Sequence, residues 1–175
     1  MIEQFMKKFT QPHPVKMKRQ TGFTLIEIVV AASMITISLV SIAMYYKKAL
    51  DVSENTTRHI QSGFLLEEGL EAIKMLRDQS WSGNIATLST TTTYYLYWSG
   101  TLWMSTTTPQ KIENIFERSF RIAEVRRDGS DNIASSGTLD DGTRKVTVSV
   151  TWPVEGGGAA TPDIAETYIT NLLTN

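Results

Sequence analysis

The sequence of 175 residues contains no cysteine, which excludes a disulfide framework, a thiolate metal site and a cysteine nucleophile. Its two histidines, His13 and His59, form no plausible catalytic triad or zinc site, and we expect His59 to be a solvated surface residue. The formal net charge of −1 gives no overall attraction to nucleic acid. The sequence therefore offers little support for an enzyme, and it predicts no cofactor.

The charges are unevenly distributed along the chain. Five of the 17 Lys and Arg residues, but only one of the 18 Asp and Glu residues, precede Gly22. The part after Gly22 is therefore net acidic, and the front is a different kind of segment from the rest.

An apolar segment follows this basic front. Residues 23–46 contain one formal charge and neither Gly nor Pro. As a helix they would span about 36 Å, which is enough to cross the core of a bilayer. The basic residues before Gly22 outnumber Lys47 and Lys48 after the segment, so the positive-inside rule predicts a cytoplasmic N-terminus and an extracytoplasmic C-terminal part.

Glu27 is the one charge inside this segment. A carboxylate at the bilayer centre costs about 2.5 to 3.5 kcal/mol on insertion scales, although near a helix end it can reach water. The carboxylate of Glu27 therefore either remains hydrated at the cytoplasmic interface or pairs with a cation. The second interpretation is favoured, because ionisable residues within a membrane span are usually functional.

Residues 22–27, which read GFTLIE, follow a basic leader and open an apolar helix. They resemble the N-terminus of type IV prepilins and of type II secretion pseudopilins. The resemblance implies that a membrane prepilin peptidase cuts after Gly22 and methylates Phe23, and that Glu27 pairs with the free amine of a neighbouring subunit. It further implies that the partners are this peptidase, other pilin subunits, the pilus assembly platform and membrane lipid, and that the subunit passes from the inner (cytoplasmic) membrane into an extracellular filament.

Residues 1–22 would then be a prepilin leader, which is long for this family. Met17 begins the sequence MKRQTG, which by itself resembles a typical short prepilin leader. The true start is therefore open between Met1, Met6 and Met17. Either way, the leader is processing sequence and is left out of the predicted fold.

The helical pattern continues over residues 47–80. Apolar residues recur there at steps of three and four, with acidic residues opposite, so we expect an amphipathic continuation of the helix to about Asp78. The polar stretch 53–59 is the weakest part, and fraying is expected there. The apolar positions are Leu65, Leu66, Leu70, Ala72, Ile73 and Leu76.

Residues 81–175 are rich in Thr, Ser, Gly and aromatic residues, which predicts a β-rich head. We expect a hairpin around Ser99 and Gly100, an alternating strand over 115–127, and a strand that opens at Asp141 and Gly142 and ends at Pro153. Trp98 and Trp103 are expected in the core. The last of these strands should place on one face Val146, Val148, Val150 and Trp152.

Residues 164–173 predict a last strand with Ile164, Tyr168 and Leu172 facing inward, although their spacing also fits a short helix. The predicted fold class is α+β and pilin-like. A long N-terminal helix, transmembrane in its first half and amphipathic in its second, should pack on a C-terminal antiparallel sheet of about four or five strands.

Two groups of charged residues in the head raise the question of ligands. Asp128, Asp131, Asp140 and Asp141 lie near glycines, as in calcium loops, and the pseudopilin resemblance implies that such a loop can bind calcium. Their spacing does not match an EF-hand, so turn formation is favoured over a metal site.

A stripe of basic residues in the head is interleaved with acidic residues. It therefore predicts a solvated, mixed-charge face rather than a DNA-binding surface. Its members are Arg118, Arg121, Arg126, Arg127, Arg144 and Lys145.

Together, the residues and the resemblance favour a structural subunit of a type IV pilus, most similar to a minor pilin. A type II secretion pseudopilin is the alternative within the family, and a calcium-dependent fold would favour it. Outside the family, the alternative is a signal-anchored or secreted extracytoplasmic binding protein, cut after a small residue such as Ala43. The mature N-terminus discriminates between these hypotheses.

Overall fold

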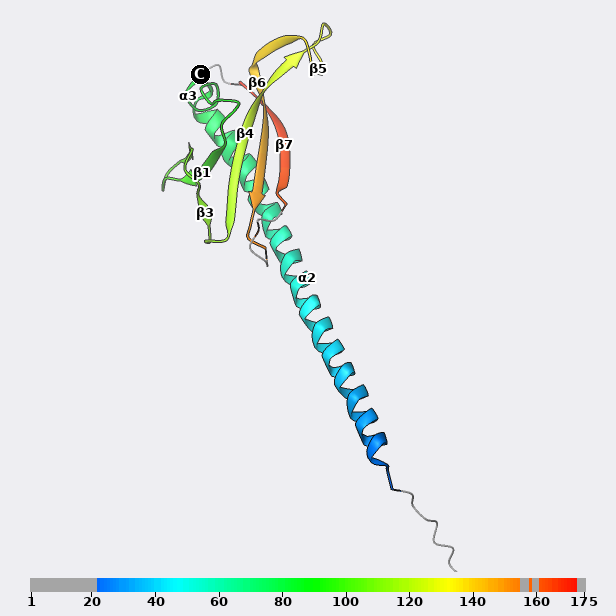
Figure 1. Ribbon diagram of the computed structural model, residues 1–175. Helices are drawn as coiled ribbons and strands as arrows, with labels where there is room; N and C mark the ends of the chain where they lie inside the picture. The colour runs from blue at the N-terminus through cyan, green and yellow to red at the C-terminus, as the bar shows by residue number, and fades with distance from the viewer. Residues whose placement is uncertain (1–21, 155–157, 159–160, 173–175) are drawn as a thin grey trace, which may run out of the picture. The chain divides into compact units, whose positions relative to one another are not determined.

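The computed structural model describes residues 22–154, 158 and 161–172, and the predicted leader before Gly22 lies outside them (Figure 1). The chain divides into two compact units, one up to Ala49 and one from Leu50 onward. The first unit contains the apolar part of helix α2, and the second contains the remainder of α2 together with the sheet.

Helix α2 runs from Leu25 to Gln79, close to the predicted end at Asp78. The expected fraying over residues 53–59 is not observed. The hydroxyls of Thr56 and Thr57 donate to the carbonyls four residues earlier, at 2.8 and 2.9 Å, and Arg58 forms an ion pair with Glu54. The Glu54–Arg58 pair stabilises this stretch of low intrinsic propensity, and the threonine hydroxyls find their partners within the helix itself.

The second unit contains a seven-stranded antiparallel sheet, which confirms the α+β, pilin-like fold class (Figure 1). Its main path has the order β2-β1-β4-β6-β7, and two very short strands, β3 and β5, each pair with β4. A short helix α3, Trp81–Asn84, follows α2. The strands are β1 Tyr94–Trp98, β2 Trp103–Thr106, β3 Lys111–Ile112, β4 Phe116–Arg127, β5 Ile133–Ala134, β6 Thr138–Thr151 and β7 Asp163–Thr170.

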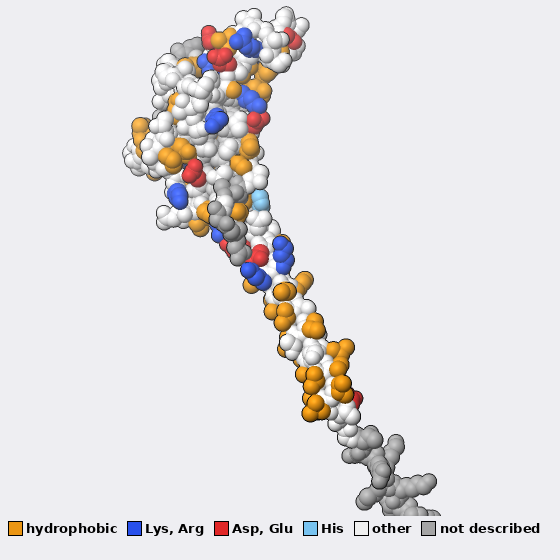
Figure 2. All heavy atoms as spheres, viewed as in Figure 1, with side chains coloured by type: hydrophobic (Ala, Val, Ile, Leu, Met, Phe, Trp, Pro, Cys, Tyr) orange, Lys and Arg blue, Asp and Glu red, His pale blue; other side chains and the backbone are white. Residues whose placement is uncertain are grey.

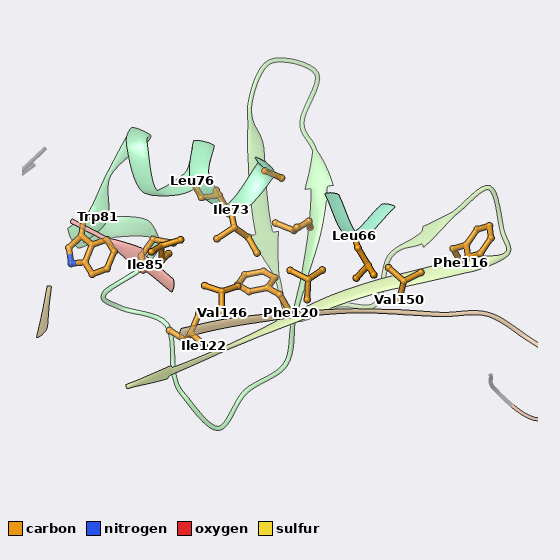
Figure 3. Packing of buried hydrophobic residues seen from close by; sticks show 14 of the residues in the cluster. Leu66, Ile73, Leu76, Trp81, Ile85, Phe116, Phe120, Ile122, Val146 and Val150 are labelled. Atoms are coloured by element: carbon orange, nitrogen blue, oxygen red, sulfur yellow. The ribbon is translucent and has the colours of Figure 1, made fainter. Parts of the chain in front are cut away.

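The core lies between one face of the sheet and the second part of α2 (Figure 3). From the helix it receives Leu66, Ile73 and Leu76, which belong to the apolar positions predicted from the sequence. The predicted inward face of β6 is confirmed, because Val146, Val148, Val150 and Trp152 are all at most 2% exposed. Each such aliphatic side chain stabilises the fold by about 1.5 to 3 kcal/mol through its burial.

Gly69 allows the helix to approach the sheet closely. A Cβ atom at this position would lie 3.0 Å from Arg118 Cδ and 3.0 Å from Val148 Cγ1. Arg118 itself is buried under the helix, where it donates to the Leu65 carbonyl at 3.1 Å and pairs with Glu68. The prediction that Arg118 belongs to a solvated face is therefore wrong, because its guanidinium meets the helix flank instead of water.

The predicted strand opening at Asp141 and Gly142 is also wrong. Strand β6 already begins at Thr138, and these two residues lie in an irregularity where the β4–β6 register shifts. The shift follows from the pairs Glu124 with Arg144 and Val125 with Asp140, which leave three residues of β6 without a partner on β4. The Asp-Gly signal therefore marks a bulge within a strand and not a turn.

Strand β7 is confirmed as a strand, but its predicted inward face is wrong. Ile164, Tyr168 and Leu172 are 56, 47 and 67% exposed, whereas Ile169 is buried. Residues spaced by four lie on one side of a strand, and here β7 turns the other side to the core. Trp98, which was expected in the core, is likewise exposed.

We expect Gly69→Ala to destabilise the protein by about 1 to 2 kcal/mol, because overpacking against Arg118 and Val148 exceeds the gain in helix propensity. Urea unfolding of the full chain in detergent, followed by tryptophan fluorescence, measures this change. Gly63→Ala is the matched control: nothing lies within 4 Å of its Cβ position, so it should stabilise by about 0.5 to 1 kcal/mol. Equal effects of the two substitutions would contradict the close approach at Gly69.

Candidate functional site

The predicted cleavage position lies in exposed backbone just before α2. Gly22, Phe23 and Thr24 are not helical, and the Phe23 side chain is 80% exposed. The Thr24 carbonyl accepts the amides of Glu27 and Ile28, at 3.0 and 3.2 Å, and so closes the first turn. The Gly22–Phe23 peptide bond is thus accessible, and a new N-terminus at Phe23 would stand directly at the start of the helix.

The first part of α2 has no buried residue up to Leu50 (Figure 2). By length and composition, α2 is apolar enough to cross a membrane, and none of its most apolar window is buried inside the protein. Large apolar side chains occupy most positions from Phe23 to Tyr46, including Leu25, Ile35 and Ile42. This surface is suited to lipid or to other apolar helices.

Four hydroxyl groups of this segment are satisfied within the helix. Each donates to the carbonyl four residues earlier at 2.7 to 2.8 Å. In an apolar environment these bonds remove the cost of an unpaired hydroxyl. The donors are Ser33, Thr36, Ser38 and Ser41.

Glu27 stands apart from these hydroxyls. It is exposed in the first turn of α2, and among the described residues no side chain pairs with its carboxylate. The positive end of the helix dipole favours an acid at this place, but by at most about 1 kcal/mol at an exposed site. In an apolar environment this carboxylate would need a cation as its partner.

The same segment matches a known protein-family model, whose description is "Prokaryotic N-terminal methylation motif", over residues 17–44. This match over residues 17–44 supports a relationship with the type IV pilin-like family. The match includes Gly22, Phe23 and Glu27, the three residues predicted from the sequence to act in processing and assembly. No curated protein and no solved structure is significantly similar to the chain.

Three of the aspartates considered for calcium are engaged with protein groups in the head. Asp128 accepts the amides of Ser130 and Asn132, and these bonds lower the pKa of its carboxyl group. Asp140 lies 2.7 Å from Arg127 Nε, and Asp131 lies 3.6 Å from the same nitrogen.

Within residues 22–154, 158 and 161–172, no three His, Cys, Asp or Glu residues form a cluster that could hold a metal ion. Arg127, Asp128, Asp131 and Asp140 line one hollow, but Asp141 does not. Asp128 thus holds a turn through Ser130 and Asn132, while Asp140 pairs with Arg127 beside the β6 bulge.

Like the buried Arg118, the other members of the predicted basic stripe contact acids, carbonyls or hydroxyls. Lys145 pairs with Glu166 at 2.8 Å, and Arg121 donates to the Thr93 hydroxyl. Arg144 donates to three backbone carbonyls of the β6 bulge. The surface is therefore mixed in charge, as predicted.

His59 is half-exposed but not simply solvated. Its Nδ1 atom lies 3.0 Å from Asp163 Oδ2, and its ring packs edge-on against Trp152 with the centroids 4.9 Å apart. The sequence contained no signal for this contact, because Asp163 lies 104 residues further along the chain.

We expect Asp140→Asn to destabilise the head by about 1 kcal/mol at pH 7, since it removes a charged acceptor. Hydrogen bonds from Thr143 and Arg127 hold the pKa of Asp140 below its usual value. A lowered folded-state pKa stabilises the fold above the unfolded-state pKa of about 4, and this contribution is lost as the pH falls through the folded-state pKa. The difference between variant and wild type should therefore shrink below about pH 4 in urea unfolding.

Asp141→Asn is the matched control for this experiment, because Asp141 is exposed and its side chain makes no ion pair in the described part of the chain. A pH-independent difference for Asp140→Asn, or an equal effect of both substitutions, would contradict the role of the Arg127 pair.

Proposed function

We propose that the chain is a minor pilin, a structural subunit of a type IV pilus or a related filament. The observation that carries the proposal is the N-terminal segment. There an accessible Gly22–Phe23 bond precedes an apolar helix whose one charge, Glu27, has no partner among the described residues. Pilin-like proteins are structural, and the proposal assigns this chain neither catalysis nor a cofactor.

In this proposal, residues 1–22 are the leader, residues 23–46 are the transmembrane and assembly segment, and residues 81–175 are the exported head. Prepilin peptidase removes the leader and methylates Phe23. The N-terminus is cytoplasmic while the subunit is held in the inner membrane, and the basic residues before Gly22 support this orientation. Other pilin subunits and the assembly platform are the partners, and nucleic acid is not among them.

Assembly supplies the cation that Glu27 lacks. The amine of Phe23 in a neighbouring subunit is created at the start of the same apolar helix, so it can meet Glu27 away from water. A buried pair of this kind sets the register between subunits, because a shifted neighbour would leave both charges unpaired at a cost of about 3 to 5 kcal/mol.

The alternative within the family is a type II secretion pseudopilin. A melting temperature that falls when calcium is removed would favour it over the minor pilin, whereas the pairing of Asp140 with Arg127 supports a metal-independent head. Outside the family, a signal-anchored binding protein cut after Ala43 would lose the matched motif almost completely.

The first test is the intact mass and N-terminal sequence of the chain from cells with and without prepilin peptidase. We expect N-methylated Phe23 only when the peptidase is present, because cleavage after Gly22 exposes its amine. A terminus near residue 44, or an intact leader in both cells, would sink the proposal.

The second test is Glu27→Gln, which keeps the size of the side chain and removes its charge. We expect normal removal of the leader but loss of filaments, measured by electron microscopy and by the sheared extracellular fraction. Glu54→Gln is the matched control, since Glu54 lies on the same helix and pairs with Arg58 within the chain. Normal filaments from Glu27→Gln would contradict a role in assembly and indicate that Glu27 is a hydrated residue at the membrane interface.

A further inference from the structure

Methionine is the only sulfur-containing residue of this chain, which has seven methionines and no cysteine. An oxidant that reacts with sulfur therefore meets only thioethers here. In the described part of the chain, Met34 and Met44 lie in the apolar segment, whereas Met75 and Met104 belong to the second unit. Met75 and Met104 are 51 and 44% exposed, so a water-soluble oxidant reaches their side chains.

Met104 differs from Met75 in the partner of its sulfur. The Tyr97 hydroxyl donates a hydrogen bond to Met104 Sδ at 3.3 Å, and the two residues are register partners across the β1–β2 hairpin. They face away from the core, because Tyr97 alternates with the buried Leu96. Within the described residues, the sulfur of Met75 accepts no hydrogen bond. A thioether is a weak acceptor, so the Tyr97 hydroxyl has a poorer partner than water would be.

Oxidation of Met104 would give the Tyr97 hydroxyl a better acceptor. A sulfoxide oxygen carries partial negative charge and makes the side chain polar. The methionine side chain has three rotatable bonds, so the new oxygen can turn toward the hydroxyl without movement of either strand. Because Met104 lies at the surface, the sulfoxide also keeps contact with water and is not buried without a partner.

We propose that Met104 is a reversible oxidation site, at which hydrogen peroxide converts the thioether to a sulfoxide that Tyr97 then holds. The sulfur gives up two electrons. Its bond to one peroxide oxygen forms as the O–O bond breaks, and the other oxygen takes the proton of the transferred one and leaves as water. Because the chain has no thiol, the return to the thioether requires a separate thiol-dependent reductase, which removes the oxygen as water while its own thiols form a disulfide.

The test uses the full chain in detergent with Met75→Leu, which leaves Met104 as the one methionine of the second unit. The protein is treated with hydrogen peroxide, peptide mass spectrometry measures the sulfoxide at Met104, and tryptophan fluorescence measures the melting temperature before and after. We expect Met104 to be oxidised while the head stays folded. The change in melting temperature on oxidation should be more favourable by about 2 to 4 °C with Tyr97 than with Tyr97→Phe, because only the hydroxyl bonds the sulfoxide.

Tyr168→Phe is the matched control, since Tyr168 is also exposed and alternates with the buried Ile169, but lies on β7. It should respond to oxidation as the chain with Tyr97 does. Met104→Gln is a second probe that needs no peroxide, because its amide oxygen is a strong acceptor on a side chain of similar length. In this variant Tyr97→Phe should lower the melting temperature by more than it does beside Met104.

Reversal is tested on the oxidised, folded chain. Two methionine sulfoxide reductases, one for each epimer, are added with dithiothreitol and should restore the original mass at Met104.

Three results would overturn the proposal. The first is a Met104 that stays reduced in peroxide that oxidises Met75 in the unsubstituted chain. The second is an equal change in melting temperature on oxidation with Tyr97 and with Tyr97→Phe. The third is a sulfoxide that the reductases do not remove from the folded chain. All three leave the proposed function standing, because they concern neither the N-terminus nor filament formation.

Discussion

The intrahelical hydrogen bonding of α2 is the constraint on which the rest of the structure depends. From Leu25 to Tyr46 no residue of the helix is buried by the described part of the chain, so in an apolar environment the backbone amides and carbonyls must be satisfied within the helix itself. From Leu66 to Leu76 the same helix covers one face of the sheet. One regular element therefore serves both an apolar environment and a protein core, and only the side chains change along it.

Because the backbone of α2 is hydrogen-bonded within the helix, the charged side chains on and under it are the groups that still need partners. Glu27 in the first turn has no counter-charge among the described residues, whereas Arg118 under the second part has both Glu68 and the Leu65 carbonyl. A charge away from water needs a counter-charge, and the two residues differ in whether the chain provides one. The buried guanidinium joins helix and sheet within one chain, while the carboxylate of Glu27 stays exposed.

One face of the sheet forms the core with α2, and apolar side chains remain exposed at the β1–β2 edge of the sheet. Gly69 lets α2 lie close over β4 and β6, so Phe120 and Val148 are buried but the β1–β2 hairpin remains partly uncovered. The head, which contains no cysteine, leaves Trp98 and Phe64 exposed.

The order of elements, the apolar helix with Gly22, Phe23 and Glu27, and the inward face of β6 followed from the sequence alone. They depend on local periodicity, on uninterrupted hydrophobicity and on a contiguous motif, all of which are readable over short distances. Only the tertiary structure decided the burial of Arg118, the bulge at Asp141 and Gly142, the outward face of β7 and the contact of His59 with Asp163. Each of these depends on which distant segment lies alongside, and a strand pattern does not reveal which of its two faces meets the core.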